Sequence, residues 1–156
     1  TNTERIGKVK PKKKENKTFE QNLGMIAEGD VFRIENIYYN YGKYDIRRDA
    51  RKELETTVLP VLKKYPSIVI ELRSHTDSRS ETDFNQTLSE NRAKAVVDFL
   101  VKRGIGAERM IAKGFGESRL VNGCRDGVKC GERQHQLNRR TELKVLNVSE
   151  SSLSKN

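Results

Sequence analysis

Four short stretches of the chain are rich in apolar residues, and in three of them these residues alternate with polar ones, which is the pattern of half-buried β-strands. These stretches cover residues 32–41, 68–72, 110–115 and 141–145, and the first is rich in β-branched and aromatic side chains. Gly42 follows the first stretch and is expected to end it. The sequence therefore predicts four strands.

Between the first three strands, apolar residues recur at intervals of three and four, which predicts two amphipathic helices. The first helix is expected to begin after Asp45, acting as N-cap, and to carry an apolar stripe over residues 46–65. Pro60 lies inside this stripe, where a proline removes a backbone hydrogen bond and kinks a helix. The second helix is expected over residues 83–103, with Gly104 as its C-terminal cap.

The predicted elements follow the order β-α-β-α-β-β, with a long irregular loop over residues 117–138 before the last strand. Strands interleaved with amphipathic helices favour an α+β fold, a two-layer sandwich in which helices cover one face of a four-stranded mixed sheet. We expect one folded domain at residues 30–148, between a linker at 1–29 and a short tail at 149–156.

Charge is distributed unevenly between the linker and the domain. The 156 residues include 31 Lys and Arg against 22 Asp and Glu, a formal net charge of +9. Residues 1–17 hold seven basic and two acidic side chains, so +5 of this excess lies in a segment with almost no apolar residues. Such a segment cannot bury enough apolar surface to order itself, and we expect a flexible tether. The rest of the chain is only mildly basic.

Composition narrows the class of protein further. Hydrophobic residues make up 34% of the chain and Trp is absent, so the core must be modest and built mainly from Ile, Leu and Val. No apolar run approaches the roughly 18–20 residues of a membrane-spanning helix, and the sequence therefore predicts no membrane span. The chain begins at Thr1 without the pattern of a signal peptide, which we interpret as a mature or excised fragment.

The second predicted helix carries a charged residue within its apolar stripe. Arg92 lies in one row with Leu88, Val96 and Leu100, at intervals of four residues. A buried guanidinium is costly unless an acceptor meets it, and Asp77, where the preceding strand turns toward this helix, is the nearest candidate. The pair could be structural or could form a ligand site. Its place at a strand end beside a helix start favours a ligand site.

Short motifs spread along the chain point to a known family. They are Ser74-His75-Thr76-Asp77, Asn85, Leu88-Ser89-Glu90-Asn91-Arg92-Ala93, Gly114-Phe115-Gly116-Glu117 and Asn138-Arg139-Arg140. With these motifs in this order, the chain resembles the OmpA-like domain from about Asp30 to Val148. That family comprises the periplasmic C-terminal domains of OmpA-type porins, the peptidoglycan-associated lipoprotein and flagellar motor stators. The resemblance implies the β-α-β-α-β-β fold and non-covalent binding of peptidoglycan.

The resemblance also implies which residues contact the ligand. Asp77 and Arg92 match the pair with which the family grips the diaminopimelate of the stem peptide. Diaminopimelate ends in an ammonium and a carboxylate on one carbon. Asp77 would therefore accept hydrogen bonds from the ammonium, and Arg92 would donate a forked pair to the carboxylate. In the empty site, these two residues are expected to neutralise each other.

Other motif positions imply further ligand contacts. The expected residues are Thr76, Asn85, Leu88, Arg139 and, through backbone groups, Asn40, Tyr41 and Gly42. The family usually has acidic residues near the positions of Asn40 and Gly42, so only backbone contacts are carried over to this loop. Arg139 and Arg140 have a second interpretation, as charges that protect an edge strand from aberrant pairing.

Carried over to this chain, the family's role is that of a cell-wall anchor in the periplasm, at the outer membrane of a Gram-negative bacterium. The expected partners are the peptidoglycan stem peptide and a parent outer-membrane protein or lipoprotein whose domains precede Thr1. No cofactor, metal or catalytic activity is expected, because no nucleophile or phosphate-binding glycine loop accompanies the site. The alternative is an electrostatic binder of nucleic acid or of another anionic surface, but no basic strand studded with aromatic residues supports nucleic-acid recognition.

The only two cysteines, Cys124 and Cys130, lie in the long loop with five residues between them. A disulfide is the favoured interpretation, and it fits an oxidising compartment. Zinc binding with His135 is a weaker match, because three such ligands at this spacing fit no familiar zinc site. Free thiols are the third alternative. His75 is expected to be a strand-end histidine whose ring is satisfied by backbone groups.

Overall fold

A four-stranded mixed sheet forms one layer of the structure, a computed structural model that describes residues 26–34, 37–40 and 42–148. Its strands are β1 (Val31–Ile34), β2 (Val69–His75), β3 (Met110–Gly116) and β4 (Arg140–Asn147), in the spatial order β1-β4-β2-β3. Strands β2 and β3 are parallel, whereas β4 is antiparallel to both β1 and β2. The last strand therefore lies inside the sheet.

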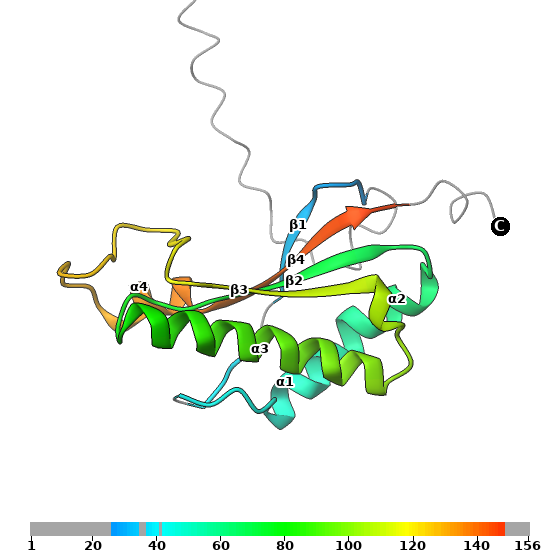
Figure 1. The fold of residues 1–156 in the computed structure, drawn as a ribbon, viewed down its shortest axis with the longest axis horizontal. Coiled ribbons are helices and arrows are strands. Elements are labelled where there is room, and N and C mark those ends of the chain that lie inside the picture. Colours follow the sequence, from blue (N-terminus) through cyan, green and yellow to red (C-terminus); the bar gives the residue numbers. More distant parts are fainter. Residues whose placement is uncertain (1–25, 35–36, 41, 149–156) are drawn as a thin grey trace, which may run out of the picture.

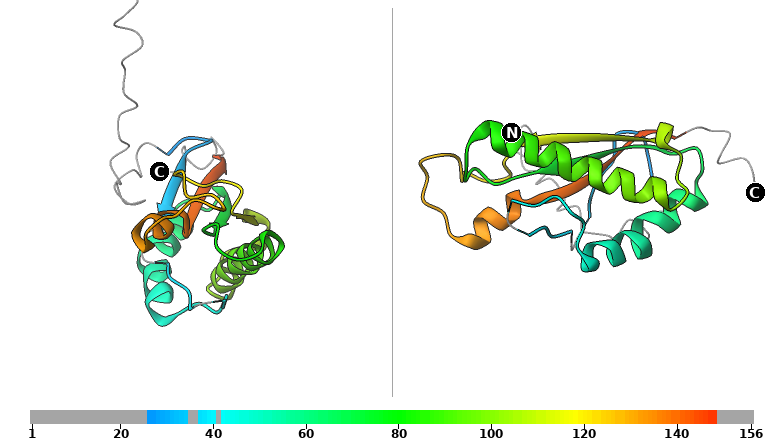
Figure 2. Two further views of the ribbon diagram at one scale, coloured as in Figure 1. Left: turned by 90° about the vertical axis from the view of Figure 1, so that its left-hand side faces the viewer. Right: turned by 60° about the horizontal axis from the view of Figure 1, so that its bottom comes forward.

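Helices form the second layer, on one face of this sheet (Figures 1 and 2). They are α1 (Arg48–Glu53), the π-helical segment Leu54–Val58, α2 (Leu59–Lys64) and α3 (Thr82–Lys102), while the short α4 (Glu132–Asn138) lies at the end of the sheet. The 3-10 turn Ala107–Arg109 leads into β3. The predicted α+β sandwich with helices on one face of a four-stranded mixed sheet is confirmed.

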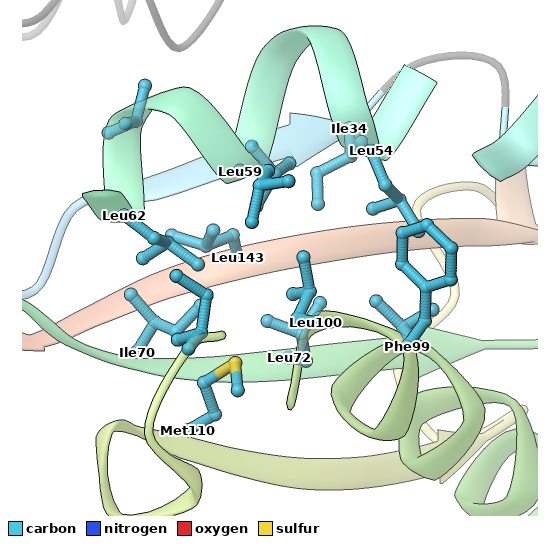
Figure 3. Packing of buried hydrophobic residues seen from close by; sticks show 14 of the residues in the cluster. Ile34, Leu54, Leu59, Leu62, Ile70, Leu72, Phe99, Leu100, Met110 and Leu143 are labelled. Carbon is cyan, nitrogen blue, oxygen red and sulfur yellow. The ribbon is translucent and has the colours of Figure 1, made fainter. Parts of the chain in front are cut away.

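The hydrophobic core fills the space between the two layers (Figure 3). Alternate residues of the central strands point into it, among them Ile70 and Leu72 of β2 and Leu143 of β4, all at most 1% exposed. Leu62 and Leu100 meet them from the helices. Because the period of two in the strands and the period of about 3.6 in the helices both place apolar side chains here, local pattern and tertiary packing agree.

The first helical stretch differs from the prediction at its N-terminus, and its geometry changes next to the proline. It begins at Arg48 with Arg47 as N-cap, not Asp45. A π-helical segment, Leu54–Val58, precedes Pro60, which lies in the first turn of α2. Pro60 has no N–H to donate to the carbonyl of Thr56, so the helix absorbs the missing hydrogen bond as a widened turn.

The second predicted helix is confirmed to within one residue at each end. Gly104 follows its C-cap with φ of +99°, a left-handed conformation that glycine adopts without steric cost. The N–H groups of Gly104 and Ile105 donate to the carbonyls of Val101 and Leu100, at 3.0 and 3.1 Å. Ile105 is buried in the core, so this cap fixes where the chain leaves α3 and turns toward β3.

Two predicted stretches are wrong because tertiary context overrides the local pattern. The first strand ends at Ile34, and residues 37–40 are not part of the sheet although Ile37 is buried. The predicted loop at 117–138 contains α4, a polar helix whose buried residues are His135 and Asn138, so it has no apolar stripe to reveal it. Most of the predicted linker and all of the predicted tail lie outside the described residues.

A candidate ligand-binding site at the end of strand β2

A cavity of about 640 Å³ opens at the carboxyl end of β2. Its walls come from the segment before α1, the end of β2 and the loop after it, the first turns of α3, and the junction of α4 with β4. Gly114 helps to fix this arrangement, because a Cβ there would lie 2.5 Å from Ser89 Oγ of α3. The close approach of α3 to β3 is therefore possible only with glycine at this position.

Asp77 lies in the loop after β2, and its carboxylate is almost fully buried. Its oxygens accept hydrogen bonds from Arg79 N at 2.9 Å, from the Arg79 guanidinium at 2.9 Å and from the Arg139 guanidinium at 2.6 Å. Burial alone would raise the pKa of Asp77, but these hydrogen bonds outweigh it and lower the pKa below its usual value. The carboxylate is therefore charged, and hydrogen bonds from Arg79 and Arg139 stabilise that charge.

Arg92 is also buried, at 7% exposed, and its environment is different. Its Nε donates to the carbonyl of Lys43 at 2.9 Å, and the guanidinium carbon lies 4.5 Å from the ring centroid of Tyr39. Burial lowers the pKa of Arg92. No carboxylate of the described residues forms an ion pair with this guanidinium, so its positive charge is met only by an aromatic face and a carbonyl.

The expected neutralisation of Asp77 by Arg92 is therefore wrong. The reason is competition: Arg79, two residues further along the same loop, and Arg139, at the end of α4, already occupy the carboxylate. Both Asp77 and Arg92 nevertheless line the same cavity, as the sequence predicts.

Tyr39 supports Arg92 from the segment before α1. Its hydroxyl donates to the backbone carbonyl of Arg92 at 3.4 Å while its ring lies against the guanidinium. Burial raises the pKa of Tyr39 to about 12, even though the charge of Arg92 acts in the opposite direction. The ring is thus a neutral platform that limits the orientations of Arg92.

Four residues form a closed network of ion pairs beside Asp77. Arg79 and Arg139 each contact both Asp77 and Glu132, the latter at 2.9 and 2.5 Å. Gln136 adds an acceptor for Arg139 at 2.5 Å. Sequence analysis missed Arg79, Glu132 and Gln136 as site residues. Arg79 could have been found, because it lies two residues from Asp77 in the sequence. Glu132 and Gln136 lie on α4, in a stretch where the sequence predicts a loop.

Asn85 and Thr76 both line the cavity, and their side chains are engaged in different ways. The Nδ2 of Asn85 donates to the carbonyls of Arg79, Asp77 and Ser80 at 2.9, 3.3 and 3.4 Å, so its donors hold the loop that carries Asp77. Thr76 lines the cavity, and its buried hydroxyl has no partner within the described part of the chain. Thr76 therefore offers a free hydrogen-bonding group, and Asn85 positions Asp77.

The other predicted residues divide into those that line the cavity and those that do not. Leu88, Gly42 and Arg139 line it, and Gly42 has φ of +64°. Asn40 is exposed, and its carbonyl accepts from Lys43 N at 2.9 Å. Tyr41 lies outside the described residues. Arg140 begins β4, an interior strand, so its interpretation as an edge-strand charge is wrong.

The long loop is closed by a disulfide between Cys124 and Cys130, as expected. With both sulfurs bonded to each other, they cannot form a zinc site with His135. The loop also contacts the site: Ser78 Oγ donates to the carbonyl of Cys124 at 2.5 Å. The disulfide is therefore linked by one hydrogen bond to Ser78, the residue that follows Asp77.

His75 pairs with a side chain and not with backbone groups as expected. Its Nε2 lies 2.5 Å from Glu142 Oε1, and its ring stacks on Phe115 with centroids 5.2 Å apart. Burial lowers the pKa of His75. Burial raises the pKa of Glu142, whereas its partners His75 and Arg140 lower it. The partners have the larger effect, and the pKa of Glu142 is lowered to about 2.

Comparison with known proteins identifies the family of the chain. A sequence model described as the OmpA family matches residues 38–133, which include Asp77 and Arg92. The chain belongs to the OmpA family. The match confirms the resemblance predicted from the motifs.

Proteins that are similar in sequence to this chain include ones named for the outer membrane and for peptidoglycan. The chain is 31% identical over 96 residues to the peptidoglycan-associated lipoprotein of Agrobacterium fabrum, covering 62% of this chain and 53% of that protein. It is 32% identical over 99 residues to outer membrane protein A of Serratia marcescens, covering 62% of this chain and 27% of that protein. A stretch of 113 residues is 42% identical to photosystem I P700 chlorophyll a apoprotein A2 of Gloeobacter violaceus, covering 71% of this chain and 13% of that protein. The chain thus spans between 13% and 53% of these relatives.

Solved structures agree with the OmpA-family fold. The peptidoglycan-associated lipoprotein from Burkholderia pseudomallei superposes with a TM-score of 0.60 at 26% identity, covering 70% of this chain and 87% of that one. The cell wall anchor of the T6SS from Pseudomonas aeruginosa superposes with a TM-score of 0.59 at 22% identity, covering 74% and 78%, and this likeness supports the fold alone. In the described residues, none of the helices has the length and apolar character needed to cross a membrane.

Proposed function

We propose that this OmpA-family chain is a peptidoglycan-binding module, without catalytic activity of its own, that grips the diaminopimelate of a stem peptide. The observation that carries the proposal is the buried Arg92 guanidinium, which shares a cavity with Asp77 and has no carboxylate partner among the described residues. A buried charge without a counter-ion is costly unless a ligand supplies one. The peptidoglycan-associated lipoproteins among the relatives support the choice of ligand.

The carboxylate of diaminopimelate is the group that Arg92 would bind. With Nε donating to Lys43 and one face against Tyr39, the terminal nitrogens of the guanidinium are left to donate to an incoming carboxylate. The Thr76 hydroxyl, buried and without a partner, offers a further hydrogen bond from the cavity wall.

The ammonium of diaminopimelate would bind Asp77 by exchange. The Asp77 carboxylate is already occupied by Arg79 and Arg139, so a ligand ammonium must displace one of these guanidinium groups. Arg79 is the group to be displaced, because its side chain is 51% exposed and can turn toward solvent, whereas that of Arg139 is 26% exposed. The methylene groups between the ligand's two ends would lie against Leu88 and Phe84.

In this proposal, the chain anchors a larger protein to the cell wall at the outer membrane, in the periplasm. Thr76, Gly42 and Arg139 contribute to the site alongside Asp77 and Arg92, and Asn85 positions the Asp77 loop. Each site recognises one stem-peptide terminus, and the repeating polymer raises the effective affinity. The disulfide fits this oxidising compartment.

Co-sedimentation with purified peptidoglycan tests the proposal. Asp77→Ala and Arg92→Ala should each abolish sedimentation with the polymer while circular dichroism shows a folded domain. Arg51→Ala and Asp98→Ala, which change the same charges on exposed helix surfaces, should sediment like the parent chain. Sedimentation of both site variants at the level of these controls would contradict the proposal.

A further inference from the structure

The face of the sheet that carries no described helix is strongly basic. Figures 1 and 2 show α1, α2 and α3 on the opposite face. A row of register partners crosses all strands on the exposed face: Arg33 of β1, Glu142 of β4, Arg73 of β2 and Lys113 of β3. Residues paired in register share a face, and neighbouring strands are about 4.8 Å apart, so these charges lie close together.

Three cations of this face converge on one aromatic ring. Arg119 lies 3.9 Å from the ring centroid of Phe115, and Arg73 and Lys113 each lie 5.4 Å from it. Phe115 is only 8% exposed, and His75 stacks on its ring. We call Arg73, Lys113, Arg119 and Phe115 the cation cluster.

The carboxylates of this face neutralise only Arg73 of the cation cluster and leave Lys113 and Arg119 without a carboxylate partner among the described residues. Glu71 pairs with Arg73 at 2.7 Å, and Glu142 is engaged by His75 and Arg140. Lys113 and Arg119 are both exposed and, within the described residues, neither has a carboxylate partner within ion-pair distance. Like charges opposite one another in a sheet are destabilising, so this arrangement favours an external anion.

The whole face has an excess of positive charge. Arg33, Arg73, Lys113, Arg119, Arg140 and Lys144 are basic, and Glu71 and Glu142 are acidic, a net charge of +4. Ile111, the register partner of Glu71, is 49% exposed on this face.

We propose that this face docks on a membrane surface rich in anionic phospholipids, with the phosphodiester headgroups meeting Lys113 and Arg119. A basic, four-stranded surface with one exposed aliphatic side chain, Ile111, fits a layer of phosphates and the adjoining apolar boundary. A nucleic acid is a poorer fit, because the one aromatic ring of the cation cluster is buried beneath its cations and cannot stack on bases. The inference does not depend on the Asp77 cavity.

Vesicle co-sedimentation of the full chain tests this inference. The chain should bind vesicles of phosphatidylcholine with one quarter phosphatidylglycerol and not vesicles of phosphatidylcholine alone. Lys113→Gln/Arg119→Gln should lower the partition coefficient about 10- to 30-fold, as expected for the loss of two basic residues at an anionic surface. Lys52→Gln/Lys94→Gln, with the same charge change on exposed helical positions, should lower it less than about threefold. Glutamine retains part of each side chain over Phe115, and circular dichroism verifies the fold.

Three outcomes would overturn the inference. One is no binding to the anionic vesicles, and a second is an equal loss in the two double variants, which would indicate net charge alone. The third is unchanged vesicle binding by Lys113→Gln/Arg119→Gln with lost binding of a single-stranded oligonucleotide, which would make the ligand a nucleic acid. Asp77→Ala should bind vesicles normally, so failure here is distinguishable from failure of peptidoglycan binding.

Discussion

Asp77 and Arg92 line one cavity, yet the protein treats their charges in opposite ways. The Asp77 carboxylate accepts three hydrogen bonds from Arg79 and Arg139, and these lower its pKa. The Arg92 guanidinium has a carbonyl and the Tyr39 ring as its partners, and burial lowers its pKa. The comparison indicates that an incoming anion meets a cation that is ready for it, whereas an incoming cation must displace one that is already bound.

The largest effect should come from removing the charge of Arg92. Arg92→Gln is expected to weaken binding of a diaminopimelate-containing stem peptide by about 100-fold or more, within the range for loss of one member of a buried, hydrogen-bonded charge pair. Arg92→Lys should restore little, because an ammonium cannot fork a carboxylate or stack on Tyr39 in the same way. Isothermal titration calorimetry measures both. Parent-like affinity of Arg92→Gln would contradict the assigned role.

A smaller loss is expected on the Asp77 side. Asp77→Asn should weaken binding of the same peptide by about tenfold, the low end for a hydrogen bond to a charged group. The loss is small because the ligand ammonium gains Asp77 only by displacing Arg79. If Asp77→Asn loses as much affinity as Arg92→Gln, the proposed asymmetry between the two residues is wrong.

Acid should destabilise the region behind Asp77, where His75 and Glu142 meet. The pKa of Glu142 is lowered from 4.5 to about 2, so its contribution to stability is complete above pH 4.5 and is lost as pH falls toward 2. The pKa of His75 is lowered from 6.5, so protonation favours the unfolded chain and acts in the same direction below that pH. Urea unfolding at several pH values should show the free energy of unfolding falling with acid. Glu142→Gln should flatten this dependence below pH 4.5, and an unchanged slope would contradict the pair.

Arg79 offers a gain of affinity and not a loss. Arg79→Gln should tighten stem-peptide binding about two- to fivefold, because the guanidinium that competes with the ligand ammonium is 51% exposed, and ion pairs of exposed side chains contribute roughly 0.2–1 kcal/mol. Arg51→Gln, on the exposed surface of α1, is the matched control. Weaker binding by Arg79→Gln would mean that Arg79 contacts the ligand directly.

The disulfide should matter least for binding. Cys124→Ser/Cys130→Ser removes a short loop closure beside α4, and stability should fall by about 2 kcal/mol in the loop-entropy estimate. Binding should weaken only about threefold, because the loop touches the site through Ser78 and leaves Arg92 unchanged. Thermal unfolding and calorimetry measure the two effects, and complete loss of binding would show that the loop forms part of the site.

The fold was predictable where local pattern and tertiary packing agree. Ile70, Leu72 and Leu143 alternate with polar residues because one face of their strands is buried, and Gly104 ends α3 because a left-handed residue is required there. Helix α4 was not predictable, since its buried residues, His135 and Asn138, are polar and leave no apolar period. The short pairing of β1 was hidden for the opposite reason: Ile37 is apolar and buried but lies outside the sheet.

The site was predictable residue by residue but not in its pairing. Arg92 was found because a charged side chain in an apolar helical row needs an explanation, and Asp77 because it follows a strand. Their ion-pair partners were missed, because ion pairing depends on which charged side chains the tertiary fold places within reach of the carboxylate. Arg139 comes from the end of a helix that the sequence pattern did not reveal.

The affinities of the parent chain and Arg92→Gln for two soluble stem peptides provide the most direct test. One peptide carries diaminopimelate and the other carries lysine at the same position, so the second lacks only the side-chain carboxylate. The parent chain should prefer the diaminopimelate peptide by about 100-fold, and Arg92→Gln should bind both equally weakly, since the coupling lies between one guanidinium and one carboxylate. Equal binding of both peptides by the parent chain would contradict the proposal that Arg92 recognises diaminopimelate.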